Sequence, residues 1–367
     1  MNASGTYSQN ITLNGDVTVN CTSGTVFING VISGTGSITK TGSSQLQIQS
    51  VSTYTGSTTV SAGYLVVARD GSISSTSSVQ VASGAQLSFD TNADATFNKV
   101  ISGTGNLVFS SPRNYYLTAN NTFTGTTTIQ GSANLYLGNG GTLGAIEGTI
   151  SVINNSSLIF NRSYAHTHNG VITGAGRIEK IGANVLTLGG VNTFTNQIII
   201  TAGTLAITNA SALGTTTTQN VPAGATLSFV PSANMTFSRV ISGAGNVLIA
   251  PTDGNVTFSA ANTYTGTTTV TSGWLSLGET GSIATSSSVI LNGGELQLGG
   301  DKTIRGLSGS SAVRLNAHTL TLSIATGSSH TFSGIISGTG GLRNSEPHRR
   351  QYIFGRNKSK QRSHIDA

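Results

Sequence analysis

Residues 30–67 read GVISGTGSITKTGSSQLQIQSVSTYTGSTTVSAGYLVV, and the beginning of this stretch recurs along the chain. The five versions of its VISGTG motif begin at Val31, Val100, Val171, Val240 and Ile335. The first four are spaced almost evenly, at a period of about 70 residues, whereas the last interval is longer by roughly one coil. A long and nearly constant period is the signature of a stack of similar structural units. We therefore predict a repeat protein, with one extra coil inserted before the fifth motif.

Within each copy, apolar and polar residues alternate, as in Leu65 and Val67 with Tyr64 and Val66 between them. Alternation with a period of two is typical of half-buried β-strands. Clusters of Gly, Asn and Ser between the alternating runs predict turns, because Gly and Asn tolerate positive φ angles. The chain is rich in β-branched residues, and no helical periodicity of useful length occurs.

The short strands and long period together predict an all-β fold, a parallel β-helix (β-solenoid) of about 15 coils in a single elongated domain over residues 1–342. A coil takes about 20–25 residues, so about three coils make one repeat, and equivalent residues are expected to stack directly in every third coil. The expected interior columns are Leu65, Leu135, Leu205 and Leu275, and Tyr54, Phe123, Phe194 and Tyr264. A propeller is the alternative, but its blades repeat at about 40–50 residues and fit poorly.

The repeat pattern stops after Leu342. Residues 343–367 contain seven of the 18 Lys and Arg residues, so the repeat body is almost neutral. A neutral body argues against nucleic acid as a partner, because phosphate binding needs a clustered basic face. We interpret residues 343–367 as a non-repeat basic tail that is disordered or results from a frameshift or truncation; the rival interpretation is a genuine basic extension that binds an acidic partner.

The quoted stretch resembles the autotransporter-associated β-strand repeat, also called the passenger-associated transport repeat. The residues that carry the resemblance in the first copy are Ile32, Gly34, Gly36, Lys40, Gly42, Tyr54, Gly56, Gly63 and Leu65. Those in the third copy are Ile172, Gly174, Gly176, Lys180, Gly182, Asn192, Phe194 and Leu205. The second and fourth copies lack the Lys-x-Gly element. The resemblance implies a passenger domain of a secreted or surface-displayed bacterial protein, folded as a right-handed β-helix, whose full-length form carries an outer-membrane translocator domain.

From this resemblance we expect a structural, secretion-promoting repeat region on the bacterial cell surface. The alternatives are an adhesin-type module that presents one face of the β-helix to host or cell-surface molecules, and a polysaccharide-active β-helix enzyme. We expect no enzymatic activity, no cofactor and a monomer. No signal peptide is recognisable at the N-terminus, so the sequence is interpreted as a fragment. The single cysteine, Cys21, excludes an intrachain disulfide.

Several residues are candidates for chemistry. His166 and His168 form an HxH pair that could ligate a metal, but both occupy positions where the other copies have core residues, so we expect them in the core. The glycine pairs of the motif, beginning with Gly34 and Gly36, lack the third glycine of a dinucleotide site and are predicted to be turns. Among the scattered acids only Asp90 and Asp94 lie close in sequence, so no catalytic pair is predicted, and no metal site.

Two further groups concern corners and surfaces. The corner asparagines, Asn121, Asn192 and Asn262, precede the aromatic of each corner and are expected to bond the backbone there. The side chains of Trp274 and Tyr64 are expected to point outward and are our candidates for surface contact.

Overall fold

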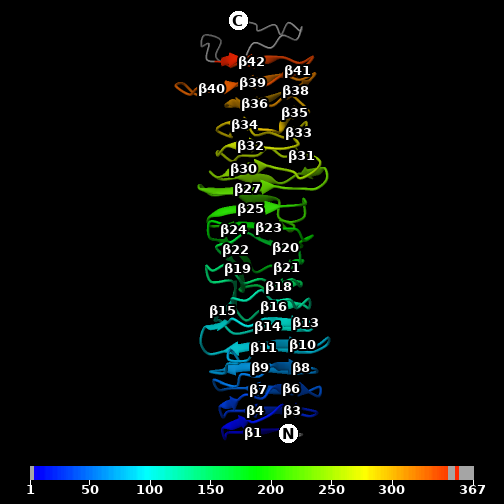
Figure 1. Cartoon of the computed structure of the whole chain (residues 1–367). Coiled ribbons are helices and arrows are strands. Elements are labelled where there is room, and N and C mark those ends of the chain that lie inside the picture. Colours follow the sequence, from blue (N-terminus) through cyan, green and yellow to red (C-terminus); the bar gives the residue numbers. More distant parts are fainter. Residues whose placement is uncertain (1–3, 346–351, 355–367) are drawn as a thin grey trace. The chain divides into compact units, whose positions relative to one another are not determined.

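The computed structural model describes residues 4–345 and 352–354, which form 43 strands and no helix. They divide into two compact units, unit 1 (residues up to 184 and 190–198) and unit 2 (residues 185–189 and from 199 onward). The strands of each unit pair in parallel with strands of the neighbouring turns, as Figure 1 shows for β4, β7 and β9. The predicted all-β β-solenoid is thereby confirmed, with about 16 turns in the described chain.

In unit 1 the largest sheet contains β1 (Gly5–Tyr7), β4 (Thr25–Ile28), β7 (Gln45–Ile48), β9 (Tyr64–Arg69), β11 (Gln86–Thr91), β14 (Asn106–Phe109), β16 (Thr127–Ile129), β18 (Ile150–Val152) and β21 (Ile172–Gly174). A second sheet contains β3 (Val17–Asn20), β6 (Ile38–Thr41), β8 (Thr58–Val60), β10 (Val79–Val81) and β13 (Ile101–Gly103). A third contains β12 (Ala95–Phe97), β15 (Asn114–Leu117), β17 (Asn134–Leu137), β19 (Ser157–Asn161) and β22 (Arg177–Ile181). Unit 1 also contains β2 (Ile11–Leu13), β5 (Ile32–Gly34) and β20 (His166–His168), and β24 (Ile198–Ile200) begins in unit 1 and ends in unit 2.

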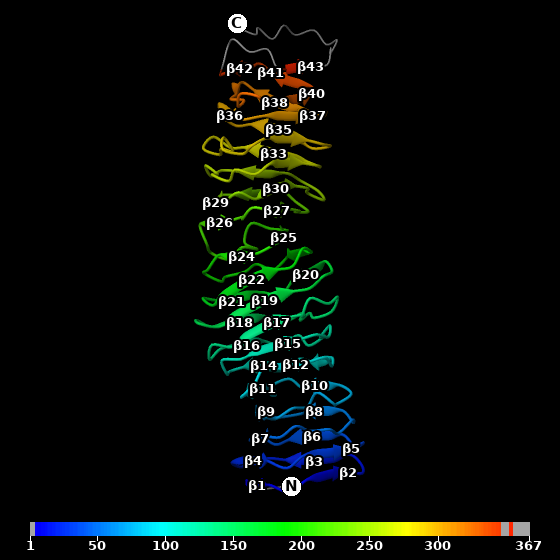
Figure 2. The same cartoon turned by 90° about the vertical axis from the view of Figure 1, so that its left-hand side faces the viewer.

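In unit 2 the largest sheet contains β23 (Val185–Leu188), β25 (Gly203–Ile207), β27 (Ala225–Phe229), β30 (Asn246–Ile249), β32 (Thr268–Val270), β34 (Val289–Leu291), β37 (Leu307–Gly309), β40 (His330–Phe332) and β43 (Tyr352–Phe354). A second sheet contains β28 (Met235–Phe237), β31 (Val256–Phe258), β33 (Trp274–Leu277), β35 (Glu295–Leu298), β38 (Val313–Asn316) and β41 (Ile336–Gly338). Two short sheets contain β26 (Thr218–Asn220) with β29 (Val240–Ser242), and β36 (Lys302–Ile304), β39 (Leu320–Leu322) and β42 (Leu342–Asn344). Figure 2 shows β33, β35 and β38 in successive turns.

The turns of the solenoid are shorter than one third of the sequence repeat. In unit 1, Leu65 aligns with Leu46 one turn below and with Leu87 one turn above. A turn therefore takes about 20 residues, at the short end of the range for a parallel β-helix. Three such turns are shorter than one repeat of about 70 residues. Equivalent residues of successive repeats therefore lie in different sheets.

This offset separates the leucines that were expected in one column. Leu135 aligns with Tyr115 and Leu158, in a different sheet from Leu65. In unit 2, Leu205 on β25 and Leu275 on β33 likewise belong to different sheets. The expectation that these equivalent leucines stack directly is therefore wrong.

The interior is nevertheless made of the residues that alternation predicted. The eight side chains expected in the columns are all fully buried: Leu65, Leu135, Leu205, Leu275, Tyr54, Phe123, Phe194 and Tyr264. Burial of one such apolar side chain stabilises the fold by about 1.5–3 kcal/mol. Each sheet thus buries one set of alternating residues and leaves the other set facing outward.

The glycines of the repeated motif are turn residues. Gly34 has a φ angle of 101°, and a Cβ placed there would lie 2.3 Å from the carbonyl oxygen of Leu13 in the preceding turn. A Cβ placed at Gly36 would lie even closer, 2.0 Å from the carbonyl oxygen of Gly15. Both positions exclude a side chain because successive turns approach closely. These glycines follow strands and precede no helix within the described residues, as expected for turns and not for a dinucleotide site.

The predicted tail boundary at residue 342 falls inside β42, which pairs with β39 up to Asn344. One segment beyond it, β43, pairs in parallel with β40. Residues 346–351 and 355–367 lie outside the described residues, so our prediction for the tail remains a prediction.

Candidate functional site

Tyr64, one of the two residues predicted for surface contact, begins β9 and faces outward because its neighbour Leu65 is buried. Its side chain is 48% exposed, although it lies on a strand in the middle of a sheet. Strand register places it between Gln45 on β7 and Gln86 on β11. The result is an outward row of amide, phenol and amide on three successive turns.

Trp274, the other predicted contact residue, also faces outward but is partly covered. The guanidinium carbon of Arg314 lies 4.8 Å from the centre of the indole ring, a cation–π arrangement. Arg314 is held there by Glu295, whose Oε2 accepts a hydrogen bond from Nε at 2.6 Å. Trp274 and Glu295 are direct register partners on β33 and β35. This cluster occupies one face of the indole, which leaves Trp274 less accessible than Tyr64.

Tyr116 and Tyr136 form a third outward aromatic feature, which the repeat period does not reveal. They are register partners on β15 and β17, and their rings stack with centroids 4.6 Å apart at an angle of 26°. Burial and the nearby carboxylate of Asp94 help to raise the pKa of Tyr116, with burial as the main cause. The two tyrosines are separated by one turn of this solenoid. A search at the turn length, and not at the repeat length, would have found them.

His168 points into the solenoid from β20, as its repeat position predicted, whereas His166, on the same side of the strand, is only partly buried. His168 is 1% exposed, and its Nδ1 lies 3.2 Å from the carbonyl oxygen of Ile146. His166 Nδ1 lies 3.0 Å from the guanidinium of Arg162. Desolvation lowers the pKa of each histidine to about 4, so both are neutral at pH 7. A neighbouring cation disfavours a metal ion, and among the described residues no group of three metal-ligating side chains occurs.

Three acidic residues of the described chain, Asp16, Asp94 and Asp301, accept structural hydrogen bonds. Asp94 accepts two hydrogen bonds from Asn114 of the next turn, one from the backbone nitrogen at 2.9 Å and one from the side chain at 2.8 Å. These bonds lower the pKa of Asp94, whereas a general acid needs a raised pKa. Asp90 lies exposed on β11. Asp16 and Asp301 likewise accept backbone hydrogen bonds from the following turn, so these carboxylates act as structural caps.

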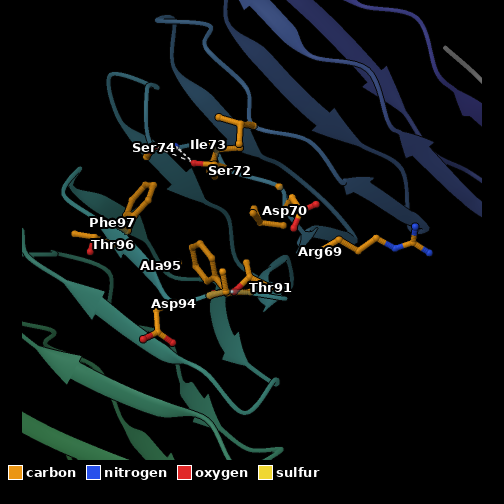
Figure 3. Close-up of a pocket in the computed structure, with 15 residues that line it drawn as sticks. Arg69, Asp70, Ser72, Ile73, Ser74, Thr91, Asp94, Ala95, Thr96 and Phe97 are labelled. Atoms are coloured by element: carbon orange, nitrogen blue, oxygen red, sulfur yellow. Dashed lines mark hydrogen bonds between the residues drawn. The ribbon is translucent and has the colours of Figure 1, made fainter.

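A cleft of about 290 Å³ lies beside Asp94 in unit 1. Its lining includes Asp70, Thr91 and Phe97 (Figure 3). In the same view the Arg69 guanidinium points away from the other labelled side chains. The cleft therefore lacks a convergent set of charged groups.

Two lysines are fully buried, which alternation alone does not lead one to expect. Lys40 donates hydrogen bonds from Nζ to three carbonyl oxygens, those of Thr41 at 2.8 Å, Gly42 at 2.8 Å and Ala62 at 3.0 Å. Lys180 donates to the carbonyl oxygen of Gly182 at 2.8 Å and to the side chain of Asn184 at 3.1 Å. Desolvation lowers both pKa values, that of Lys180 to about 8. The Lys-x-Gly element is thus a turn in which an ammonium group satisfies inward-pointing carbonyls.

The corner asparagines bond the backbone as predicted. Asn121 accepts a hydrogen bond from the nitrogen of Ile101 at 2.9 Å, and donates to the carbonyls of Ala119 and Ala145. Asn192 and Asn262 accept equivalent bonds from Ile172 and Ile241. Each side chain connects neighbouring turns, so these asparagines are structural.

Comparisons with known proteins agree with this geometry. The passenger-associated-transport-repeat family matches four segments, residues 38–67, 102–131, 178–207 and 253–277. The "Adhesin BmaC autotransporter" of Brucella suis biovar 1 (strain 1330) is 28% identical over 218 residues, which is 54% of this chain and 6% of that protein. The chain thus corresponds to a small part of the relative's length. No solved structure matches the chain. The chain therefore contains four segments that match the passenger-associated transport repeat, as its resemblance predicted, and over about half of its length it is similar to a small part of an autotransporter adhesin.

Proposed function

We propose that this chain is a structural, secretion-promoting repeat region of a surface-displayed passenger. The observation that carries the proposal is the local pairing: strands throughout unit 1 pair with strands of the adjacent turns, so each turn rests only on its neighbours. Such a chain can fold turn by turn as it emerges from a membrane, without waiting for distant segments. Folding outside the cell then opposes return of the chain and favours export.

The similarity to an autotransporter adhesin supports a secreted or cell-surface location. The described residues contain no helix that could span a membrane. The structural use of Asp16, Asp94 and Asp301 as caps supports a role without catalysis.

Display on the cell surface tests this proposal. The full chain is placed between a secretion signal and an outer-membrane translocator, and its accessibility to added protease is measured on intact cells. We expect surface display of the unaltered chain and a strong loss for Leu135→Asp, because a carboxylate inside the solenoid blocks stacking of the next turn. Tyr164→Ala, at a residue 68% exposed, is the matched control and should be displayed normally. Equal display of Leu135→Asp would refute the link between stacking and export.

A second candidate function is an adhesin-type module that presents one face of the solenoid. The specific observation in its favour is the exposed tyrosine in the row Gln45–Tyr64–Gln86. The test is adherence of beads coated with the full chain to host cells, compared with beads coated with Tyr64→Ala. Undiminished adherence of the variant would exclude this row as the adhesive face.

A further inference from the structure

The outward side of β7, β9 and β11 in unit 1 differs from the other outward aromatic features. Tyr64 has no ring or cation contact among the described residues, whereas Tyr116 and Tyr136 stack on each other and Trp274 is covered by Arg314. The exposed ring of Tyr64 is therefore free to receive a ligand. Tyrosine is favoured at interfaces because it offers a large rigid surface together with a hydroxyl group.

Side-chain amides surround this ring. Gln45 and Gln86 flank Tyr64 in register, and Gln47 follows Gln45 on the same outward side of β7. Gln45 Nε2 donates to Gln47 Oε1 at 3.5 Å, and Gln86 Nε2 donates to Ser88 Oγ at 2.8 Å. Within the described chain, the Nε2 of Gln47 and the Oε1 atoms of Gln45 and Gln86 have no hydrogen-bond partner. The row thus offers both donors and acceptors to an external molecule.

The row carries no charge. Strand register extends it to Thr25 on one side and Asn106 on the other, and both are neutral polar residues. A charged ligand would find no partner of opposite sign along this row, and binding of nucleic acid requires a basic face. A neutral ligand that is rich in hydroxyl groups and has an apolar ring face matches both the amides and the phenol.

We propose that the surface formed by Gln45, Gln47, Tyr64 and Gln86 binds a neutral oligosaccharide. The inference rests on the second candidate function and specifies its ligand. Tyr64 packs against the apolar face of one sugar ring, and the glutamines exchange hydrogen bonds with hydroxyl groups on either side. Strands are about 4.8 Å apart, so Gln45 and Gln86 are separated by about 10 Å, which suits a disaccharide unit lying along the row.

The proposal is tested by measuring binding of the purified full chain to printed neutral oligosaccharides of glucose, galactose and N-acetylglucosamine. Sialylated oligosaccharides, sulfated oligosaccharides and collagen are printed on the same surface for comparison. We expect binding to at least one neutral probe that persists at high salt, because no ion pair contributes. Tyr64→Ala should weaken it at least about tenfold, as expected for loss of an aromatic anchor. Gln86→Ala should weaken it less, and Tyr64→Phe should retain most of it.

Tyr164→Ala is the matched control, because it removes an exposed tyrosine outside this row, and it should bind normally. Thermal unfolding of every variant verifies that the solenoid is intact. Absence of binding to all neutral probes, binding confined to acidic probes or collagen, or equal binding by Tyr64→Ala would overturn the proposal. None of these results affects the surface-display assay, so failure of the ligand proposal is distinguishable from failure of the proposed export function.

Discussion

The first and second repeats of unit 1 fill equivalent interior positions with different chemistry. The first repeat buries the ammonium group of Lys40, whereas the second places Phe109 at the same position, stacked on Phe89 with ring centroids 5.1 Å apart. The first repeat also buries Tyr54, whose hydroxyl lies 2.6 Å from Thr58 Oγ1. The second has Phe123 there, and the buried Oγ1 of Thr127 lacks a hydrogen-bond partner within the described residues.

This difference shows that the solenoid backbone tolerates either a polar or an apolar interior, provided that the surrounding atoms match. Strands β6 and β14 both keep parallel neighbours in regular register, although one carries Lys40 and the other Phe109. Loss of the Lys-x-Gly element therefore does not interrupt the stacking. We expect the contacts of Lys40 and those of Phe109 to contribute differently to the free energy of unfolding. Substitutions at these two positions measure the difference.

The largest expected effect is in the apolar interior. Phe109→Ala should lower the free energy of unfolding by about 4 kcal/mol, because it removes a stacked ring and leaves a cavity beside Phe89 and Tyr115. Chemical denaturation of the full chain measures the change. Phe109→Leu is the control and should lose much less. A loss below about 1 kcal/mol for the alanine variant would show that the second repeat does not depend on this aromatic cluster.

The third repeat extends the comparison with His168 where the second has Phe97. The folded His168 has a pKa of about 4 and the unfolded residue about 6.5, so only the unfolded chain binds this proton between pH 6.5 and 4. Stability should therefore fall as the pH falls through this window, and His168 should contribute about 3 kcal/mol of that loss by pH 4.

His168→Phe should flatten the pH dependence of the denaturation midpoint, whereas His318→Phe, at a partly exposed residue, serves as the control. An unchanged pH profile in His168→Phe would mean that this histidine accepts a proton in the folded protein.

The next effect concerns the buried ammonium. Lys40→Met keeps the length of the side chain but leaves the carbonyls of Thr41, Gly42 and Ala62 without their donor, so we expect a loss of about 2 kcal/mol in the free energy of unfolding. Ile249→Met, at the equivalent position of the fourth repeat, is the matched control and should cost less than about 1.5 kcal/mol. If Lys40→Met is as stable as the unaltered chain, the ammonium is dispensable for this turn.

The smallest expected effect concerns the aromatic corners. Phe123→Tyr should raise the free energy of unfolding by about 1 kcal/mol, because the new hydroxyl can bond the unpartnered Oγ1 of Thr127. Tyr54→Phe should lower it by a similar amount, because it removes the bond to Thr58. The denaturant midpoints of both variants measure these two changes. A shift of both midpoints in the same direction would contradict the difference in hydrogen bonding between the corners of Tyr54 and Phe123.

The sequence sufficed to predict the strands and the interior because alternation specifies which side of a strand is buried. The burial of Leu65 and Leu135 follows directly from their apolar neighbours two positions away. The repeat period did not reveal the stacking, because one repeat is not a whole number of turns. The turn length becomes visible only in strand register, such as Leu65 with Leu87.

The surface was less predictable than the interior. Alternation placed the side chains of Tyr64 and Trp274 outward. It did not predict that Arg314, on a strand two turns further along the solenoid, extends its side chain over the Trp274 ring. The buried Lys40 was also unexpected, because its carbonyl partners come from a turn whose backbone geometry the residue types alone do not specify.

The central claim is the length of a turn. The observed length places Gln47 beside Val66. A slightly longer turn would place Gln47 beside Asp70 instead. Disulfide formation between paired cysteine substitutions tests this directly, because the bond requires Cα atoms about 4.4–6.8 Å apart. We expect ready cross-linking in Gln47→Cys/Val66→Cys and almost none in Gln47→Cys/Asp70→Cys, each quantified by mass spectrometry of the oxidised full chain. The reverse pattern would contradict the register on which the fold, the repeat offset and the ligand row all depend.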